Sequence, residues 1–83
     1  MTEAMSAQVS VYALGNQDLS RAVSQTLDTF RERGLTVTPG SMSSIVVGDV
    51  DTVFDSMKEA YVSLARQGPC VVVATFSNAC PVK

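Results

Sequence analysis

The side chains that most often carry catalysis or bind metal ions are scarce in this sequence. There is no histidine, and the two cysteines, Cys70 and Cys80, lack the close spacing of a zinc site. The positive neighbour of Cys80 is Lys83 alone, so little favours the reactive thiolate form of this cysteine. Gly15 is isolated and lacks the lysine of a phosphate-binding loop. We therefore predict that the protein is not an enzyme and uses no metal or cofactor.

Hydroxyl side chains among apolar residues are the second kind of chemistry that the sequence offers, and they favour binding. Ser10 and Tyr12 alternate with valines in one apolar segment, and Ser44 and Thr75 lie in two others. Pockets for small molecules are largely apolar and carry a few placed polar groups. A surface that carries these four residues could therefore form a pocket. The plainer alternative is that they are ordinary strand residues whose hydroxyls bind water.

Four short segments that could position these side chains have the pattern of β-strands. Residues 8–14 alternate between two sides and are rich in β-branched residues. Residues 35–38 and 41–47 flank the turn sequence Pro39-Gly40, which predicts a hairpin. Residues 70–76 are a nearly continuous apolar run, typical of a well-buried strand.

Two further segments have apolar residues at helical spacing and carry signals at their ends. Residues 18–33 begin with Asp18, whose carboxylate can accept hydrogen bonds from the first turn, and are followed by Gly34, a common residue after a helix end. A second helix opens at Asp49 by the same logic and stops at Gly68-Pro69. Both aspartates are therefore expected to cap helices.

The order of these segments is strand, helix, strand, strand, helix, strand. Two right-handed crossovers in this order place both helices on one face of a four-stranded antiparallel sheet. The fold class is therefore predicted to be α+β, with the ferredoxin-like βαββαβ arrangement. The 83 residues make one domain over residues 1–83, with an ordered core of about residues 7–78.

The sheet face without helices is predicted to be more apolar than a hydrated surface. In the last strand Val71 and Val73 point to one side while Val72, Ala74 and Phe76 point to the other, so both sides are apolar. A chain of this length also has a thin core, and small domains often gain stability by association. We therefore expect the open face to pack against a second copy, in a homodimer or homotetramer.

The charge pattern argues against nucleic acids and membranes as partners. The chain has six basic and eight acidic residues, and the basic ones are scattered except for Arg31 and Arg33. A nucleic-acid binder usually shows a basic patch, so RNA binding through Tyr12 and Phe76 ranks last. No apolar run approaches the roughly 20 residues that span a bilayer, and Met1–Ala7 lacks the apolar core of a signal peptide. A cytoplasmic location is expected.

Four segments of the chain resemble the YkoF family, over roughly residues 7 to 81. They are Ala7–Leu14, Val37–Ser44, the stretch from Gly48-Asp49 to Val53-Phe54, and Val73–Pro81. Three positions depart from the expected pattern, which has proline in place of Ala13, threonine in place of Ser44 and, in wider relatives, glutamate in place of Val47. The resemblance therefore implies no carboxylate role at position 47.

The YkoF resemblance implies a βαββαβ fold and a binding function without turnover. The ligand would be thiamine or its hydroxymethylpyrimidine moiety, in thiamine uptake or salvage, with thiamine transporter components as candidate partners. The better-known YkoF proteins carry two such domains in tandem, whereas this chain carries one. Two copies, or four, are therefore expected to do what one tandem chain does.

The chemistry of an aminopyrimidine then selects candidate contacts. The ring offers a nitrogen acceptor beside an amine donor and two flat faces, so it needs a donor and acceptor pair and apolar walls. Asp18 or Asp49 could attract the cationic thiazolium, although capping is their expected role. The residues predicted to supply the donor and acceptor pair are Ser10, Ser43, Ser44, Thr75 and Asn78. The residues predicted to form the walls are Tyr12, Met42 and Phe76.

A second hypothesis needs no ligand. The same apolar sheet face would serve a protein-interaction or oligomerisation module, and the departures from the YkoF pattern favour this alternative. A pocketless, well-packed interface between copies would support it. A concave pocket lined by Ser10, Tyr12 or Ser44 would count against it.

Overall fold

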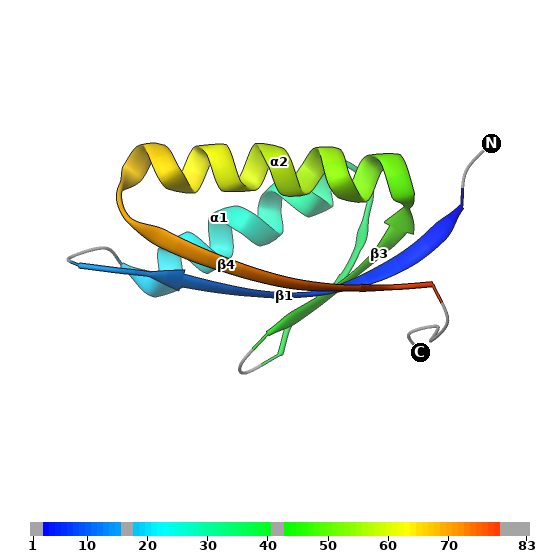
Figure 1. Cartoon of the computed structure of the whole chain (residues 1–83), viewed down its shortest axis with the longest axis horizontal. Helices are drawn as coiled ribbons and strands as arrows, with labels where there is room; N and C mark the ends of the chain where they lie inside the picture. Colours follow the sequence, from blue (N-terminus) through cyan, green and yellow to red (C-terminus); the bar gives the residue numbers. More distant parts are fainter. Residues whose placement is uncertain (1–2, 16–17, 41–42, 79–83) are drawn as a thin grey trace.

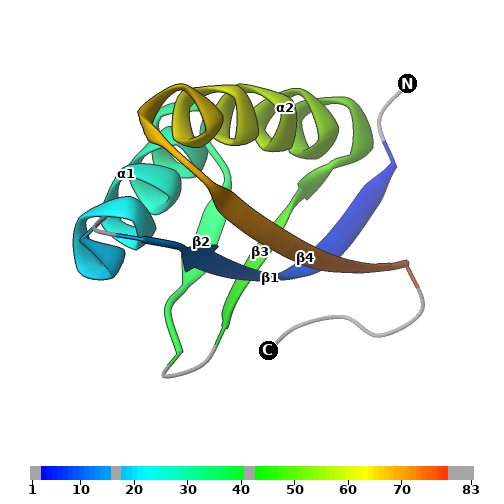
Figure 2. The same ribbon diagram turned by 60° about the vertical axis from the view of Figure 1, so that its left-hand side comes forward.

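The computed structural model describes residues 3–15, 18–40 and 43–78, and these form six elements in the predicted order (Figure 1). Their bounds are β1 Ala4–Ala13, α1 Leu19–Glu32, β2 Thr36–Thr38, β3 Ser44–Asp49, α2 Val50–Gln67 and β4 Cys70–Ser77. The strands form one sheet in the order β2-β3-β1-β4, and every neighbouring pair is antiparallel. Both helices cover the same face of this sheet (Figure 2). The predicted α+β, ferredoxin-like fold is confirmed.

All four strands differ from their predicted bounds, and two of them differ by a single residue, since β2 begins at Thr36 and β4 ends at Ser77. β1 starts at Ala4 rather than at residue 8, because the alternation of exposed Ala4, buried Met5 and half-buried Ser6 continues the strand pattern. The packed core thus begins before residue 7. β3 continues to Asp49 rather than ending at residue 47, and its predicted first residues 41 and 42 lie outside the described residues.

The predicted helix caps are confirmed. The Asp18 carboxylate accepts a hydrogen bond from the Arg21 backbone amide at 3.2 Å. Asp49 accepts one from the Thr52 amide at 3.1 Å and another from the Thr52 hydroxyl at 2.7 Å. Gly34 follows the end of α1 with φ +83°, a backbone conformation that glycine adopts at little cost.

The core lies between the two helices and the covered face of the sheet. Phe30 of α1, Val46 of β3, and Val53 and Leu64 of α2 are its largest fully buried apolar side chains. α1 contacts β1 and β2, whereas α2 contacts β3, β1 and β4, so the two helices cover different parts of the sheet. This division leaves room for a cleft beside α1.

Candidate ligand-binding site

A cleft of about 180 Å³ opens between the first turns of α1 and the adjoining sheet. The strands contribute its floor, the helix one wall and the residues before β3 the rim. It is lined by Val9, Val11, Tyr12, Leu19, Val23, Thr26, Leu27, Gly40, Ser43 and Ser44. A water molecule has a share of about 30 Å³ in the liquid, so the cleft corresponds to about six waters. That volume suits a single substituted ring.

Thr26 and Ser44 bring hydroxyl groups to the covered side of the cleft, while Tyr12 and Ser43 lie at its rim. The buried Thr26 hydroxyl donates to the Ala22 carbonyl at 2.9 Å, which leaves its lone pairs as acceptors. The Ser43 hydroxyl accepts from the side-chain amide of Gln8, an exposed residue of the open sheet face, at 2.9 Å. Ser44 is 6% exposed and lines the same space. The cleft can therefore offer both a donor and an acceptor to one ligand.

Among the described residues that line the cleft, none has an acidic or basic side chain of the Asp, Glu, Lys or Arg type. Asp18 and Asp49, which were candidates to attract a cation, are engaged as caps and do not line it. The hydrogen bonds from the Thr52 hydroxyl and amide lower the pKa of the Asp49 carboxyl. The cleft is thus electrically neutral and suits an uncharged ligand group.

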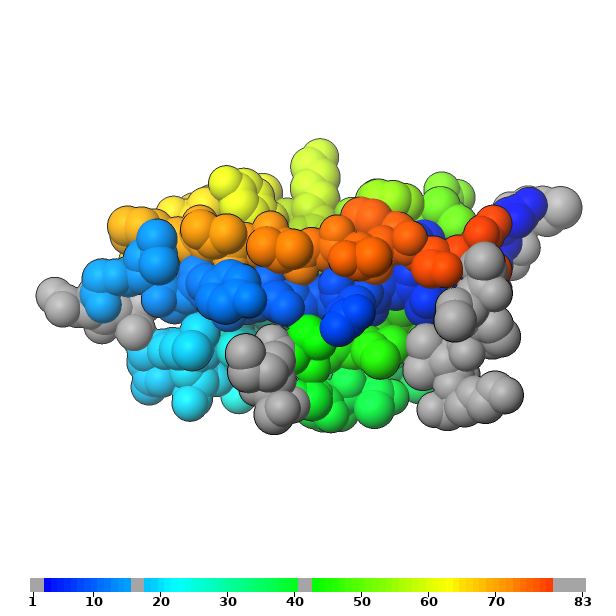
Figure 3. Space-filling model, turned by 60° about the horizontal axis from the view of Figure 1, so that its bottom comes forward, coloured from blue at the N-terminus to red at the C-terminus, as the bar shows by residue number. Residues whose placement is uncertain are grey.

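The structure divides the eight predicted binding residues among different places. Tyr12, Ser43 and Ser44 line the cleft. Ser10 and Thr75 lie on the open sheet face, since β1 and β4 pair Ser10 with Val73 and Gln8 with Thr75. Figure 3 shows this open face, with β4 and β1 running side by side. Met42 lies outside the described residues.

Phe76 and Asn78 lie away from the cleft, near the start of α2. They line a shallow depression together with Met5, Val50, Phe54 and Ser77. The rings of Phe54 and Phe76 have centroids 4.7 Å apart and planes inclined by 34°. Phe76 therefore packs on a neighbouring aromatic ring and forms no wall of the cleft.

The prediction that Ser44 shares the open face with Ser10 and Tyr12 is wrong. The register pairs Ser44 with Val9, whose side chain points into the core, and opposite residues of a ladder point to the same face. Ser44 therefore lies under the helices. The cleft that Ser44 lines lies between a helix and the sheet of one chain.

Sequence reasoning missed the contribution of α1 to the cleft. Segment 18–33 was predicted only to be a helix, but four of its residues line the cleft: Leu19, Val23, Thr26 and Leu27. One signal was present: Thr26 follows Ala22 by one helical turn and therefore lies within the apolar stripe of the helix.

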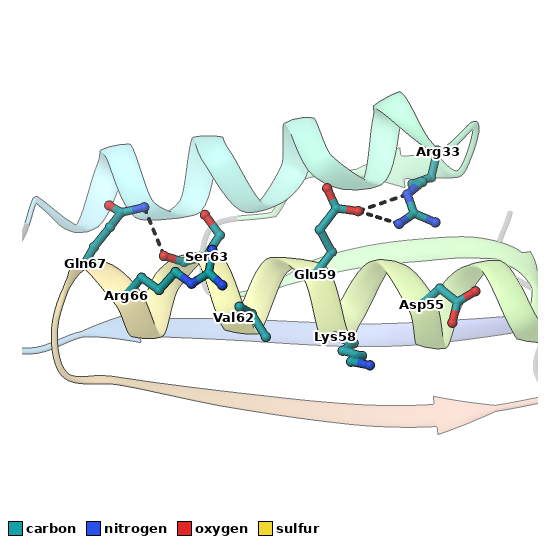
Figure 4. Close-up of a pocket in the computed structure, with 8 residues that line it drawn as sticks. All are labelled: Arg33, Asp55, Lys58, Glu59, Val62, Ser63, Arg66 and Gln67. Atoms are coloured by element: carbon teal, nitrogen blue, oxygen red, sulfur yellow. Dashed lines mark hydrogen bonds and ion pairs between the residues drawn. The ribbon is translucent and has the colours of Figure 1, made fainter.

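A second, wider depression of about 760 Å³ lies on the outer surface of α2 (Figure 4). Its charged groups partly neutralise one another, because the Arg33 guanidinium donates to the Glu59 carboxylate, with Nε and Oε1 3.0 Å apart. Gln67 donates to the Ser63 carbonyl at 3.3 Å. The pair of Arg33 and Glu59 joins the end of α1 to α2, so we interpret this depression as a contact between helices.

Metal and membrane sites were also sought among the described residues. Within residues 3–15, 18–40 and 43–78, no three histidine, cysteine, aspartate or glutamate side chains come together as metal ligands. Neither α1 nor α2 is both long and apolar enough to cross a membrane.

The fold and the cleft together define a small ferredoxin-like domain with a largely apolar cleft beside α1. Comparison with protein families agrees with this class. The chain belongs to the YKOF-related family, whose model matches residues 4–83. No curated protein sequence matches the chain.

Solved structures share the fold at low sequence identity. A hypothetical protein from Methanocaldococcus jannaschii is 22% identical with a TM-score of 0.85, over 98% of this chain and 86% of that one. A domain of unknown function from Bacillus cereus is 16% identical with a TM-score of 0.77, over 99% and 84%. A Thermotoga maritima protein with a suggested role in thiamine biosynthesis or salvage is 16% identical with a TM-score of 0.77, over 89% and 82%. These similarities establish the fold alone.

Proposed function

We propose that the protein binds thiamine through its hydroxymethylpyrimidine moiety, in the cleft between α1 and the sheet. The observation that carries the proposal is the lining of the cleft, in which apolar walls surround the hydroxyl-bearing residues Thr26 and Ser44, with Ser43 at the rim. Membership of the YKOF-related family and the name of the Thermotoga maritima relative support the choice of ligand.

The size and polarity of the cleft support one ring as the bound part. Pockets for drug-sized ligands have volumes of roughly 300–1,000 Å³, and this cleft has about 180 Å³. An aminopyrimidine would place its ring between Val11 and Val23, with its nitrogen and amine toward the hydroxyls. The thiazolium would then extend toward solvent, where a cation keeps its hydration.

We further propose that binding occurs without chemical change to the ligand. Among the described residues that line the cleft, Tyr12 is the one titratable side chain, and none of the others could act as a general base beside Thr26 and Ser44. Incubation of the protein with thiamine, followed by chromatography, is expected to return intact thiamine. Release of free pyrimidine or thiazole would contradict this part of the proposal.

The wider role that we propose is thiamine uptake or salvage in the cytoplasm. It rests on the family and on the name of the Thermotoga maritima relative. Association into a homodimer or homotetramer and contact with transporter components belong to the same proposal. They would let a single-domain chain present more than one cleft at a time.

Calorimetric titration with three probes tests the ligand. Thiamine and hydroxymethylpyrimidine are expected to bind. Hydroxymethylpyrimidine phosphate is expected to bind at least about tenfold more weakly, because its charge would lose hydration in a cleft with no cation. The proposal would be contradicted if neither unphosphorylated probe gave a heat of binding with protein whose circular dichroism spectrum shows that it is folded.

A matched pair of variants tests the site. Thr26→Val keeps the side-chain shape but removes the hydroxyl, and it is expected to weaken binding by about 2- to 10-fold, the value of one hydrogen bond. Thr29→Val is the control: Thr29 lies one turn further along α1, donates to the Gln25 carbonyl at 3.0 Å and does not line the cleft. Equal losses in both variants would place the ligand elsewhere.

A second candidate function, a ligand-free interaction module, is favoured by one observation. Val71 and Val73 are 45% and 51% exposed on the open face of the sheet. An apolar surface of this kind is suited to protein contact. The calorimetric titration distinguishes the two functions, since an interaction module would take up neither thiamine nor its pyrimidine.

A further inference from the structure

The outer surface of α2 carries two neighbouring rows of side chains, each made of residues four apart in the sequence. One row faces α1 and joins the two helices (Figure 4). In this row Glu59 accepts hydrogen bonds from the Arg33 guanidinium. Two turns further along, Gln67 donates to the side-chain oxygen of Gln25 at 2.8 Å. The first row therefore has a role in holding the two helices together.

The second row alternates apolar and basic side chains and consists of Phe54, Lys58, Val62 and Arg66. All four are exposed, and Phe54 and Val62 keep 47% and 37% of their surface open to solvent. Figure 4 shows Val62 between Arg66 and Lys58 along the helix. In the described part of the chain, neither Lys58 nor Arg66 forms an ion pair. We call these four residues the α2 outer row.

The surroundings of the α2 outer row are more basic than the chain as a whole. The chain has six basic and eight acidic residues, and three of the six basic ones line the wider depression on α2: Arg33, Lys58 and Arg66. The acidic residues there are Asp55 and Glu59, and Glu59 is paired with Arg33. Asp55 thus remains beside two cations. Because charged surfaces associate with surfaces of opposite sign, the excess of cations favours an acidic partner.

We propose that the α2 outer row is a docking site for an acidic amphipathic helix of another protein. The apolar side of that helix covers Phe54 and Val62, and two of its carboxylates meet Lys58 and Arg66. These two cations are eight residues apart, which is about 12 Å along a helix, and two turns of a partner helix span about 11 Å. An amphipathic helix repeats its side chains at this spacing and can lay one face along such a row.

The row fits a protein helix better than an anionic membrane or a second copy of this chain. Attraction to anionic lipid takes a cluster of about four to eight basic residues, whereas this row has Lys58 and Arg66, with Asp55 beside them. A two-fold contact centred on Val62 would place Lys58 of one copy opposite Arg66 of the other, and like charges repel. The docking surface is also separate from the ligand cleft, because no described residue lines both.

Nuclear magnetic resonance titration of the isotope-labelled full chain with two synthetic peptides tests the docking site. The first peptide is an amphipathic helix with leucines along one face and two glutamates two turns apart, and the second has lysines in place of the glutamates. The glutamate peptide is expected to shift amide signals of α2 in a saturable way, and to bind more weakly as added salt screens the charges. The lysine peptide is expected to bind at least about tenfold more weakly.

Charge reversal tests the two cations of the row. The double variant Lys58→Glu, Arg66→Glu is expected to lose at least about tenfold in affinity for the glutamate peptide and to gain affinity for the lysine peptide. The control is Arg21→Glu, Arg31→Glu, which reverses two exposed cations of α1 that do not line the depression. Because both double variants have the same net charge, the difference between them reports the position of the charges. The control is expected to lose much less affinity.

Three results of the titration would overturn the proposal. The first is a lack of saturable shifts with the glutamate peptide, or equal affinity for the two peptides. The second is undiminished binding by folded Lys58→Glu, Arg66→Glu, with folding checked by circular dichroism. The third is a set of shifted amides on β1 and β4 rather than on α2, which would assign the peptide to the open sheet face.

Two further results would assign the α2 outer row to a different occupant and would overturn the proposal as well. Vesicles that contain phosphatidylserine could retain the wild-type chain and the control but not Lys58→Glu, Arg66→Glu, which would indicate a membrane. Light scattering after size-exclusion chromatography could show that this double variant alone has a smaller particle mass, which would indicate a second copy of the chain.

Discussion

The half of the molecule under α1 and the half under α2 present different surfaces to a ligand or partner. α1 leaves a recessed cleft that is lined by Thr26 and Ser44 and has Ser43 at its rim. α2 closes over its core with Val53, Ala60 and Leu64 and leaves apolar groups outside, along β4. The difference indicates that one small sheet can carry two separate surfaces. The helix that leaves a gap above the sheet forms a cleft for a small molecule, and the helix that closes over its core leaves apolar side chains outside, where a protein could bind.

The largest expected effect comes from truncating one leucine in each half. Leu64 of α2 is 2% exposed in the closed core, and Leu27 of α1 is 8% exposed beside the cleft. Leucine-to-alanine changes cost about 2–5 kcal/mol, depending on the cavity that they leave. Leu64→Ala is expected near the upper end and Leu27→Ala near the lower end, measured by urea denaturation. Equal costs would mean that the α1 half is packed as tightly as the α2 half.

A smaller and opposite effect is expected inside the α2 half. Ser56 is fully buried, and its hydroxyl has no hydrogen-bond partner among the described residues. An unsatisfied buried hydroxyl costs about 1–3 kcal/mol. Ser56→Ala is therefore expected to raise the free energy of unfolding by about 1 kcal/mol. Ser63→Ala, on the exposed surface of α2, is the control and should change it little. A loss of stability in Ser56→Ala would show that the hydroxyl is satisfied.

The smallest effect concerns pH and the Asp49 cap at the start of α2. The Thr52 hydroxyl and amide lower the pKa of the Asp49 carboxyl in the folded chain. The ionised cap therefore stabilises the fold above the unfolded pKa of about 3.9, and this contribution is lost as the pH falls through the folded pKa. Asp49→Asn is expected to flatten the loss of melting temperature in acid. If Asp49→Asn and the wild type had identical melting profiles in acid, Asp49 would not have this role.

The fold could be predicted from the sequence because the signals for each helix and strand lie within that segment or beside it. The alternation of β1, the aspartate caps of both helices and the glycine after α1 depend on neighbouring residues alone. The order of elements then leaves few topologies. Errors were confined to strand ends, where the burial of Met5 depends on β3 and β4 rather than on its neighbours.

The site could be predicted in part, because it depends on distances between elements. Ser43 and Ser44 were identified by their hydroxyls, but the side of the sheet that Ser44 faces follows from its pairing with Val9, far away in the sequence. Thr26 was missed because an apolar stripe does not show how closely a helix approaches the sheet. Phe76 was assigned to the site, but its contact with Phe54 depends on where α2 begins.

The pairing of the first strand with the last has a consequence for synthesis on the ribosome. Ser6 of β1 lies opposite Ser77 of β4, so the central strand of the sheet lacks one partner until β4 has emerged, about 70 residues after β1. Contacts so distant in sequence slow folding. The segments that line the cleft all precede Val46 and emerge well before β4. A ligand that met the nascent chain could thus hold β1 against α1 while that strand waits for β4.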